Sequence, residues 1–321
     1  MRVSIALCTY NGERYLPEQL RSFELQTVKP DEIVVCDDGS SDQSIALLKE
    51  FAAGSSIPLR IFENGSNLGS TRNFDKAVTL CTGDVILFSD QDDAWMPEKI
   101  DLMLKAFRAC PEAGYVFSNA RLVGPEGDDL GTLLWDTVGF DEACQSRFAA
   151  GNQVEVMLRR SVVTGATMGF RRTLLPLVAP FCELWVHDGW IALLSSASRS
   201  KGVFLREALI SYRQHQAQQI GAKTATLRGN VGKLGAGAGG MLERERSRFE
   251  AVRARLLEHG LHDSPEITLL TDKITHLSSR LEMAGAGTLV KAGAVIREAL
   301  TGRYQRYSNS WQSMISDISQ R

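Results

Sequence analysis

The sequence lacks the features of a membrane-spanning or secreted protein. No run of about 18 apolar residues occurs, so no transmembrane helix is expected. The apolar stretch from Val3 to Leu7 is too short for a signal peptide. None of the six cysteines forms a C-x-x-C pair, and several lie in apolar, strand-like runs. These absences favour a cytoplasmic protein with reduced, buried thiols over a zinc or disulfide protein.

The sequence also lacks a dense stripe of basic residues interleaved with aromatic ones, which argues against nucleic-acid binding. The net charge of -2 conceals an asymmetry. Residues 222–321 contain fifteen Lys and Arg against ten Asp and Glu, whereas residues 1–221 contain twenty-one against twenty-eight. An acidic body with a basic tail favours a metal-using catalytic part joined to a segment that meets an anionic surface.

One glycine-rich motif is not preceded by a predicted strand. Residues 235–240 match the pattern G-x-G-x-x-G and precede a helical segment. A dinucleotide-binding loop needs a strand before it and a βαβ unit around it, and neither is present here. We therefore interpret this stretch as a linker.

Strand-like and helix-like segments alternate over the first 120 residues. Such alternation predicts a mostly parallel sheet with helices on both faces, an α/β fold. From about residue 222 the pattern becomes helical and amphipathic, which predicts a C-terminal helical segment. The expected strands are residues 3–10, 32–40, 58–65, 84–93 and 115–123, and the expected helices are residues 13–27, 41–54, 70–83 and 96–110.

Polar residues follow the strands of this predicted sheet. The carboxyl ends of parallel strands open onto one crevice, where α/β proteins bind ligands. Asp90 and Asp92 supply hard oxygen ligands at one strand end, which suits Mg²⁺ or Mn²⁺ together with substrate phosphates. Asp92 or Asp93 could instead cap the helix that starts near Met96, but a cap needs one acid rather than three. The residues at the strand ends are Thr9, Tyr10, Asn11, Asp37, Asp38, Asp90, Asp92 and Asp93.

Two further segments contain residues suited to binding a nucleotide. A carboxylate at Asp38 could accept the N–H of a pyrimidine base, although turn or cap chemistry explains the Asp37–Ser40 stretch as well. The segment from Asn67 to Asn73 combines a turn, a helix start and Arg72, which suits a phosphate.

Together, C-T-Y-N, D-D-G-S, N-x-G-x-x-x-N and S-D-Q-D-D with W-x-P resemble the family 2 glycosyltransferases, which have the GT-A fold. The resemblance is dense over residues 1–120 and thinner over residues 187–221. It implies a nucleotide-sugar donor, a divalent cation and inversion at the anomeric carbon. By matching position it implies nucleotide-sugar contacts at Thr9, Tyr10, Asn11, Asp37, Asp38, Arg72, Asn73 and Asp90, and metal ligation by Asp90 and Asp92.

The resemblance also implies a catalytic base. Direct displacement needs a carboxylate to take the proton of the acceptor hydroxyl. Asp188, in the segment W-V-H-D-G-W, matches the family's base, although a helix cap is the structural alternative. Trp190 could stack on the acceptor sugar or lie in the core. His215 could complete the metal shell and Arg213 could neutralise the leaving group; a merely exposed histidine is the alternative.

The sequence therefore predicts a catalytic domain over residues 1–221, with a nucleotide-sugar-binding half (1–120) and an acceptor-binding half (121–221), followed by a helical extension (222–321). We expect sugar transfer from dTDP-rhamnose or a UDP-sugar to a glycan or lipid-linked acceptor in cell-surface polysaccharide synthesis. The alternatives are a non-catalytic sugar-nucleotide or glycan-binding module and a nucleotidyltransferase.

The basic C-terminal part suggests where the protein works. Residues 302–307 mix basic and aromatic side chains, as interfacial segments do. We hypothesise peripheral contact with the inner membrane face, which would bring a cytoplasmic enzyme to a lipid-linked acceptor. A solvated helical face that packs on the catalytic domain or on another subunit is the alternative.

Overall fold

The computed structural model describes residues 1–216, 238–284 and 288–319. The chain forms two compact units. Of the described residues, unit 1 comprises residues 1–145 and 162–216, and unit 2 comprises residues 146–161, 238–284 and 288–319. The residues of the predicted linker from 235 to 237 lie outside the described ranges, whereas Ala238–Gly240 form the first turn of a helix.

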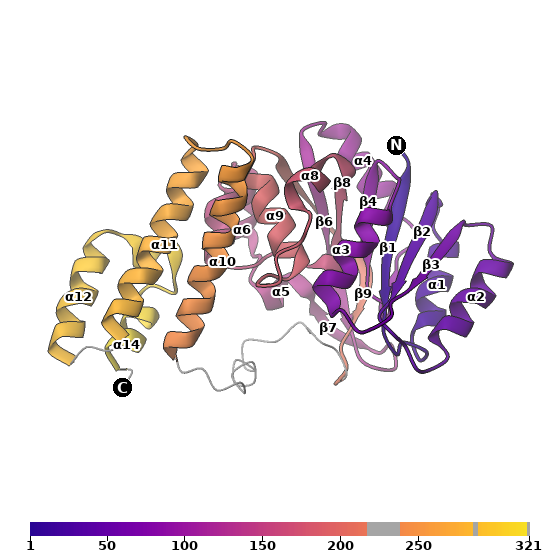
Figure 1. The fold of residues 1–321 in the computed structure, drawn as a ribbon, viewed down its shortest axis with the longest axis horizontal. Coiled ribbons are helices and arrows are strands. Elements are labelled where there is room, and N and C mark those ends of the chain that lie inside the picture. Colours follow the sequence, from indigo (N-terminus) through magenta and orange to yellow (C-terminus); the bar gives the residue numbers. More distant parts are fainter. Residues whose placement is uncertain (217–237, 285–287, 320–321) are drawn as a thin grey trace. The chain divides into compact units, whose positions relative to one another are not determined.

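Unit 1 is built on one sheet, with strand order β3-β2-β1-β4-β8-β6-β9-β5 and β7 paired to β6 (Figure 1). The first four strands in this order are parallel, and β8 pairs antiparallel with both β4 and β6. The strands are β1 (Val3–Thr9), β2 (Glu32–Asp37), β3 (Leu59–Glu63), β4 (Val85–Ser89), β5 (Ala94–Trp95), β6 (Ala113–Val123), β7 (Asp129–Leu133), β8 (Met168–Arg171) and β9 (Lys201–Arg213).

Helices cover both faces of this sheet, because its central strands are apolar on both sides. Every residue of β2 and β4 is buried, as expected for parallel strands between two helical layers. Neighbouring residues on β4 show the two layers: the Phe88 ring packs on Phe74, whereas the Ser89 hydroxyl accepts a hydrogen bond from Gln19 on the other face.

The helices of unit 1 follow the predicted order, with α3 and α9 in front of the sheet in Figure 1 and α1 behind it. They are α1 (Leu16–Glu24), α2 (Ser44–Gly54), α3 (Ser70–Leu80), α4 (Lys99–Ala109), α5 (Leu134–Val138), α6 (Glu142–Ala149, ending in unit 2), α8 (Leu175–Val178) and α9 (His187–Ala197). The prediction of an α/β fold with a mostly parallel sheet, helices on both faces and C-terminal helices is confirmed.

Unit 2 is helical. It contains α7 (Gln153–Arg159), α10 (Ala238–Glu258), α11 (Pro265–Ala284), α12 (Thr288–Leu300), α13 (Arg303–Tyr307) and α14 (Trp311–Ser319). Helices α10 and α11 pack against each other through a seam that includes Phe249, Leu256 and Leu277, all buried. Within the described ranges, no helix is both long enough and apolar enough to cross a bilayer.

Two sequence interpretations of unit 2 change in the structure. The segment α7 comes from the middle of the chain, and its packing on α11 and α13 places it in unit 2 rather than in the sheet-bearing unit. The tyrosines of the 302–307 segment, Tyr304 and Tyr307, are buried, so they do not form the exposed interfacial aromatics that the sequence suggested. The Tyr304 hydroxyl donates to Asp317 instead.

Candidate active site

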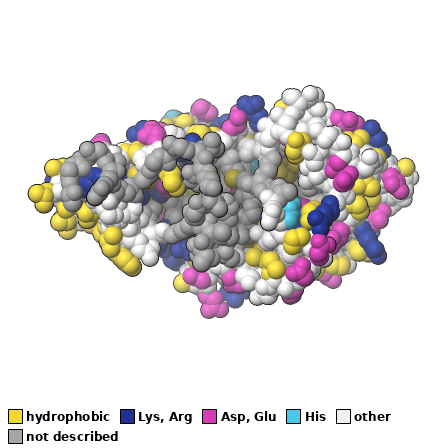
Figure 2. Space-filling model, turned by 90° about the horizontal axis from the view of Figure 1, so that it is seen from below, with side chains coloured by type: hydrophobic (Ala, Val, Ile, Leu, Met, Phe, Trp, Pro, Cys, Tyr) yellow, Lys and Arg dark blue, Asp and Glu magenta, His cyan; other side chains and the backbone are white. Residues whose placement is uncertain are grey.

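A cavity of about 780 Å³ lies in unit 1 at the carboxyl ends of β1, β2 and β4. Figure 2 views the molecule from this side and shows acidic and basic side chains gathered beside a histidine. Nine of the residues singled out in the sequence line the cavity, in agreement with the crevice expected at the ends of parallel strands. They are Thr9, Tyr10, Asn11, Asp38, Asn73, Asp90, Asp92, Asp188 and His215.

Three carboxylates converge on this cavity. Asp90 and Asp92 follow β4, and Asp188 comes from the first turn of α9. Burial, and then the negative charges of Asp92 and Asp188, raise the pKa of Asp90 from 3.8 to about 7. Burial and the charges of Asp92 and Asp90 likewise raise the pKa of Asp93 well above its ordinary value. The protein alone therefore holds these acids together at a cost in stability.

The residues present fit a divalent cation. Asp92 Oδ2 lies 2.8 Å from His215 Nε2, so these two predicted ligands are already neighbours. Within the described ranges, no group of three or more His, Cys, Asp or Glu side chains forms a complete metal shell. Two carboxylates, with diphosphate oxygens and water, are the donor set in which Mg²⁺ or Mn²⁺ is commonly held. The mutual repulsion of Asp90 and Asp92 would be relieved by such a cation.

The helix-cap alternative for the acid cluster does not hold. Helix α4 begins at Lys99 and its N-cap is Glu98, so neither Asp92 nor Asp93 caps it. Asp93 instead accepts a hydrogen bond from the backbone N–H of Arg213.

Asp38 lines the cavity just after the end of β2. Its carboxylate accepts hydrogen bonds from the backbone N–H groups of Leu68 (2.7 Å) and Gly69 (2.9 Å) and from the Asn64 side chain (2.9 Å). A carboxylate has about four acceptor positions, so room remains for one more donor such as a base N–H. Gly69 has a φ of 79°, a conformation that favours glycine at this turn.

The loop after β1 is held by side chains from two other segments, Asp37 at the end of β2 and Gln91 after β4. The Thr9 hydroxyl donates to Asp37 (2.7 Å), and Asp37 also accepts from Ser40. Gln91 clamps the backbone of Tyr10, accepting from its N–H (2.8 Å) and donating to its C=O (3.0 Å). Asp37 itself does not line the cavity and acts through Thr9 and the turn.

Asp188 is held by backbone groups at the cavity wall. Helix α9 begins at His187, with Val186 as its N-cap, so Asp188 is not the cap that the structural alternative required. Its Oδ2 accepts a hydrogen bond from the N–H of Gly165 (2.8 Å), at the start of the short 3-10 helix Gly165–Thr167. This contact orients the carboxylate at the cavity wall.

The neighbouring His187 is a buried wall residue. Its ring packs on Phe74 and Phe88, with ring centroids 4.3 and 4.6 Å away, and neither ring nitrogen has a hydrogen-bond partner among the described residues. Burial lowers its pKa to about 3, so the imidazole is neutral.

Arg213 connects the acid loop to two neighbouring segments. Its guanidinium is almost completely buried and donates to the carbonyls of Asp92 (2.8 Å) and Pro125 (3.1 Å) and to the carboxylate of Glu18 (2.6 Å). It also lies over the ring of Tyr15. Arg213 does not line the cavity, so its position fits a brace for the acid loop better than the predicted contact with the leaving group.

Two other predicted residues lie away from the cavity. Arg72 is exposed and paired with Glu183, and Trp190 is a core residue whose indole N–H donates to Val178. The arginine among the described residues that line the cavity is Arg14, which sequence reasoning missed because it lies outside the recognised motifs. Gln91 was also missed, although the motif S-D-Q-D-D contains it.

Acids grouped in a cavity at the carboxyl edge of a mostly parallel sheet define an α/β protein with a ligand-binding crevice. Comparison with known proteins identifies the family. The family model for glycosyl transferase family 2 matches residues 4–174, more than half of the chain, and the chain belongs to that family.

Curated relatives support this assignment. An uncharacterized glycosyltransferase of Nostoc sp. is 35% identical over 153 residues, which cover 43% of this chain and 46% of that protein. The dTDP-rhamnosyl transferase RfbG of Shigella flexneri is 27% identical over 222 residues, which cover 67% of this chain and 74% of RfbG. The match thus spans less than half of the Nostoc relative's length.

A solved structure shares the fold. The mannosyltransferase PcManGT from Pyrobaculum calidifontis, in complex with GDP-Man and Mn²⁺, superposes with a TM-score of 0.54 at 16% identity. The superposition covers 99% of this chain and 84% of that one. The GT-A type of fold expected from the sequence is confirmed.

Proposed function

We propose that the protein is an inverting glycosyltransferase that moves a sugar from a nucleoside-diphosphate sugar to a glycan or lipid-linked acceptor. One observation carries the proposal: Asp38 after β2, Asp90 and Asp92 after β4, and Asp188 in α9 line one cavity. Asp38 would accept the base N–H, and Asp90 and Asp92, with His215, would hold Mg²⁺ or Mn²⁺ against the diphosphate. The cation, when bound, would offset the charge that builds on the leaving nucleoside diphosphate.

The chain's own residues would carry the remaining steps. Asp188, oriented by the Gly165 N–H, would take the proton of the acceptor hydroxyl as that oxygen attacks the anomeric carbon. Attack from the side opposite the leaving group inverts the configuration at that carbon. Arg14, at the cavity wall, would contact a diphosphate oxygen. Arg213, the last residue of β9, would hold the loop that carries Asp92 and Asp93 in place.

The choice of donor is based on one relative of known donor. The similarity to the dTDP-rhamnosyl transferase RfbG favours dTDP-rhamnose, with UDP-sugars as the next candidates. Cell-surface polysaccharide synthesis is the role that such a donor and a lipid-linked acceptor would fit. None of the six cysteines is in a disulfide, which supports a reducing, cytoplasmic setting for the reaction. Peripheral contact with the inner membrane face would then bring the enzyme to its acceptor.

The test is a thermal-shift screen with dTDP-rhamnose, UDP-glucose, UDP-N-acetylglucosamine and GDP-mannose, each with Mn²⁺, Mg²⁺ or EDTA. A ligand that binds only the folded state raises the unfolding midpoint. We expect one donor to raise it in the presence of metal and to be slowly hydrolysed. Asp92→Ala should abolish both effects, whereas Asp129→Ala, an exposed acid outside the cavity, should leave them unchanged.

The outcomes separate the candidates. A shift without any hydrolysis or transfer would favour a non-catalytic sugar-nucleotide-binding module. The absence of a shift with every donor, or an unchanged shift in Asp92→Ala, would contradict the proposed site.

A further inference from the structure

Helices α12 and α14 of unit 2 expose a continuous set of large apolar side chains. Leu289, Ile296 and Leu300 recur at helical spacing along α12, and Trp311 and Ile315 lie one turn apart on α14. Together with Val290 they are 57% to 90% exposed. The two helices pack against each other, so we call these six residues the apolar edge. Figure 2 shows hydrophobic side chains gathered at the end of unit 2 that these helices form.

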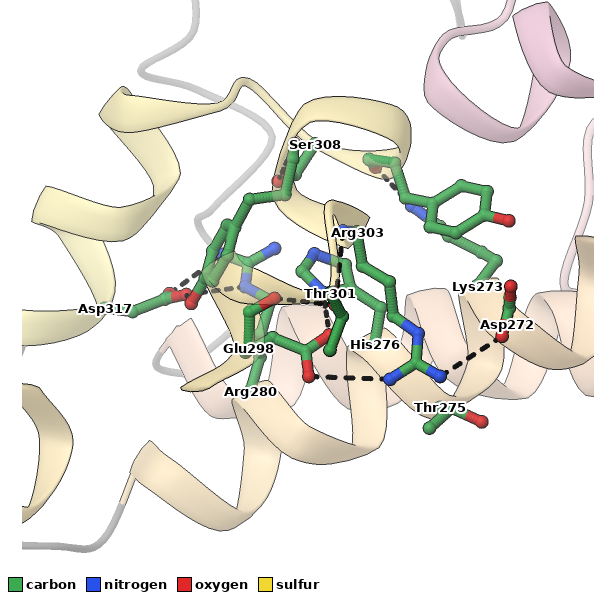
Figure 3. A network of polar contacts seen from close by, with 12 residues as sticks. Asp272, Lys273, Thr275, His276, Arg280, Glu298, Thr301, Arg303, Ser308 and Asp317 are labelled. Atoms are coloured by element: carbon green, nitrogen blue, oxygen red, sulfur yellow. Dashed lines mark hydrogen bonds and ion pairs between the residues drawn. The ribbon is translucent and has the colours of Figure 1, made fainter. Parts of the chain in front are cut away.

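A buried polar network fixes which faces of these helices point inward (Figure 3). Glu298 of α12 lies 2.8 Å from His276 Nδ1 of α11. Asp317 of α14 accepts two hydrogen bonds from Arg280, at 2.7 and 2.8 Å, and a third from the Tyr304 hydroxyl at 2.7 Å. Because both acids are anchored inside unit 2, the opposite, apolar faces of α12 and α14 must face outward.

The same arrangement sorts the charges. Within residues 288–319 the acidic side chains are Glu298 and Asp317, and both are buried. The exposed charged side chains of this segment are Arg297 and Arg306. Arg306 lies 3.9 Å from Asp272 of α11, and its guanidinium is 5.9 Å from the centre of the Tyr307 ring. The outward face of α12–α14 is therefore apolar with basic side chains and without exposed acids of its own.

We propose that the apolar edge docks onto an anionic lipid surface, with its apolar side chains among the acyl chains and Arg297 at the headgroups. Apolar side chains that include a tryptophan, next to basic residues, are typical of helices that lie in a membrane interface. A second copy of the chain fits this surface less well, since pairing the edge with itself would bring positive charges together. The inference deepens the proposed function, because a lipid-linked acceptor would lie in that surface.

The test is flotation of the full chain with vesicles of phosphatidylcholine alone or of equal parts phosphatidylcholine and phosphatidylglycerol. We expect binding to the anionic vesicles and little to the neutral ones. Leu289→Gln with Leu300→Gln should weaken binding at least about tenfold, since the variant loses two apolar side chains that would be buried among the acyl chains. Arg297→Gln should weaken it about fivefold and reduce its salt dependence. The matched control is Leu25→Gln with Leu130→Gln, two exposed leucines of unit 1.

The outcomes show whether the apolar edge binds an anionic lipid surface. Failure of the wild-type chain to bind anionic vesicles, or equal binding by the double leucine variant and its control, would overturn the proposal. A dimer that forms without vesicles and dissociates in Leu289→Gln/Leu300→Gln would assign the edge to a second copy instead. Donor hydrolysis by the same variants without vesicles should stay at the wild-type rate, so a failure of the proposed activity is detected separately.

Discussion

Asp317 of unit 2 is buried and Asp90 of unit 1 is partly buried, but their surroundings are opposite. In unit 2, Asp317 is held by Arg280 and Tyr304, so its charge is satisfied inside the protein. In unit 1, the pKa of Asp90 is raised to about 7 by burial and by neighbouring acids, and Asp93 Oδ2 has no hydrogen-bond partner among the described residues. Buried Lys99 offsets only part of this charge, because the pKa of both Asp90 and Asp93 stays raised. Acids kept together in this way indicate a site that is completed by a ligand.

The largest effect is expected at Asp188. Asp188→Asn removes the base while its backbone contact to Gly165 can persist, so turnover should fall about 100- to 10,000-fold with the fold intact. Steady-state transfer rates and circular dichroism would measure this. Asp101→Asn, in the first turn of α4, is the matched control and should keep its activity. Near wild-type turnover by Asp188→Asn would remove the catalytic assignment.

The next effect belongs to unit 2. Arg280→Met leaves Asp317 buried beside Tyr304 without its cation, which should lower the free energy of unfolding of this unit by about 3–5 kcal/mol. Hydrogen exchange of the α11 and α14 amides should speed up, while donor hydrolysis stays unchanged. Adding Asp317→Leu should restore part of the stability. If Arg280→Met abolished hydrolysis and left exchange unchanged, the contrast between the units would be wrong.

A smaller effect separates satisfied from crowded acids within unit 1. Burial alone would raise the pKa of Glu32, but hydrogen bonds from Ser4, Thr82 and Arg60 outweigh it and lower the pKa from 4.5 to about 2. A depressed folded-state pKa adds stability that is present above pH 4.5 and is lost as the pH falls toward 2, about 2 to 3 kcal/mol in all.

Denaturation of wild type and Glu32→Gln across this range would measure the effect. The difference in their free energies of unfolding should be constant above pH 4.5 and shrink between pH 4.5 and 2. A difference that does not depend on pH would show that the carboxylate charge of Glu32 contributes nothing.

Much of the nucleotide-binding half could be predicted from the sequence. Parallel strands buried on both faces produce uninterrupted apolar runs, and their carboxyl ends necessarily meet, so the sequence pattern alone suffices to group Asp38, Asp90 and Asp92. Asp188 was assigned differently, because only the resemblance of W-V-H-D-G-W to the family's base motif favoured it over a helix cap; the structure places it in the first turn of α9.

The remainder depends on tertiary packing that local patterns do not encode. Strand β8 enters antiparallel between β4 and β6, a pairing of residues far apart in the sequence. Arg213 and Trp190 carry the same chemistry whether they face a cavity or the core, and only the structure shows both buried. The burial of Tyr304 depends on its partner Asp317, which the sequence does not indicate.

The most direct test of the central claim is Asp90→Asn, measured by thermal unfolding at pH 8 with and without Mn²⁺ plus dTDP or UDP. A raised folded-state pKa costs stability that grows as the pH rises from 3.8 to about 7, so removing this charge should stabilise the ligand-free protein at pH 8. The same variant should lose the stabilisation that Mn²⁺ and nucleotide give the wild type. An unchanged midpoint without ligand, together with an undiminished response to Mn²⁺ and nucleotide, would contradict the account.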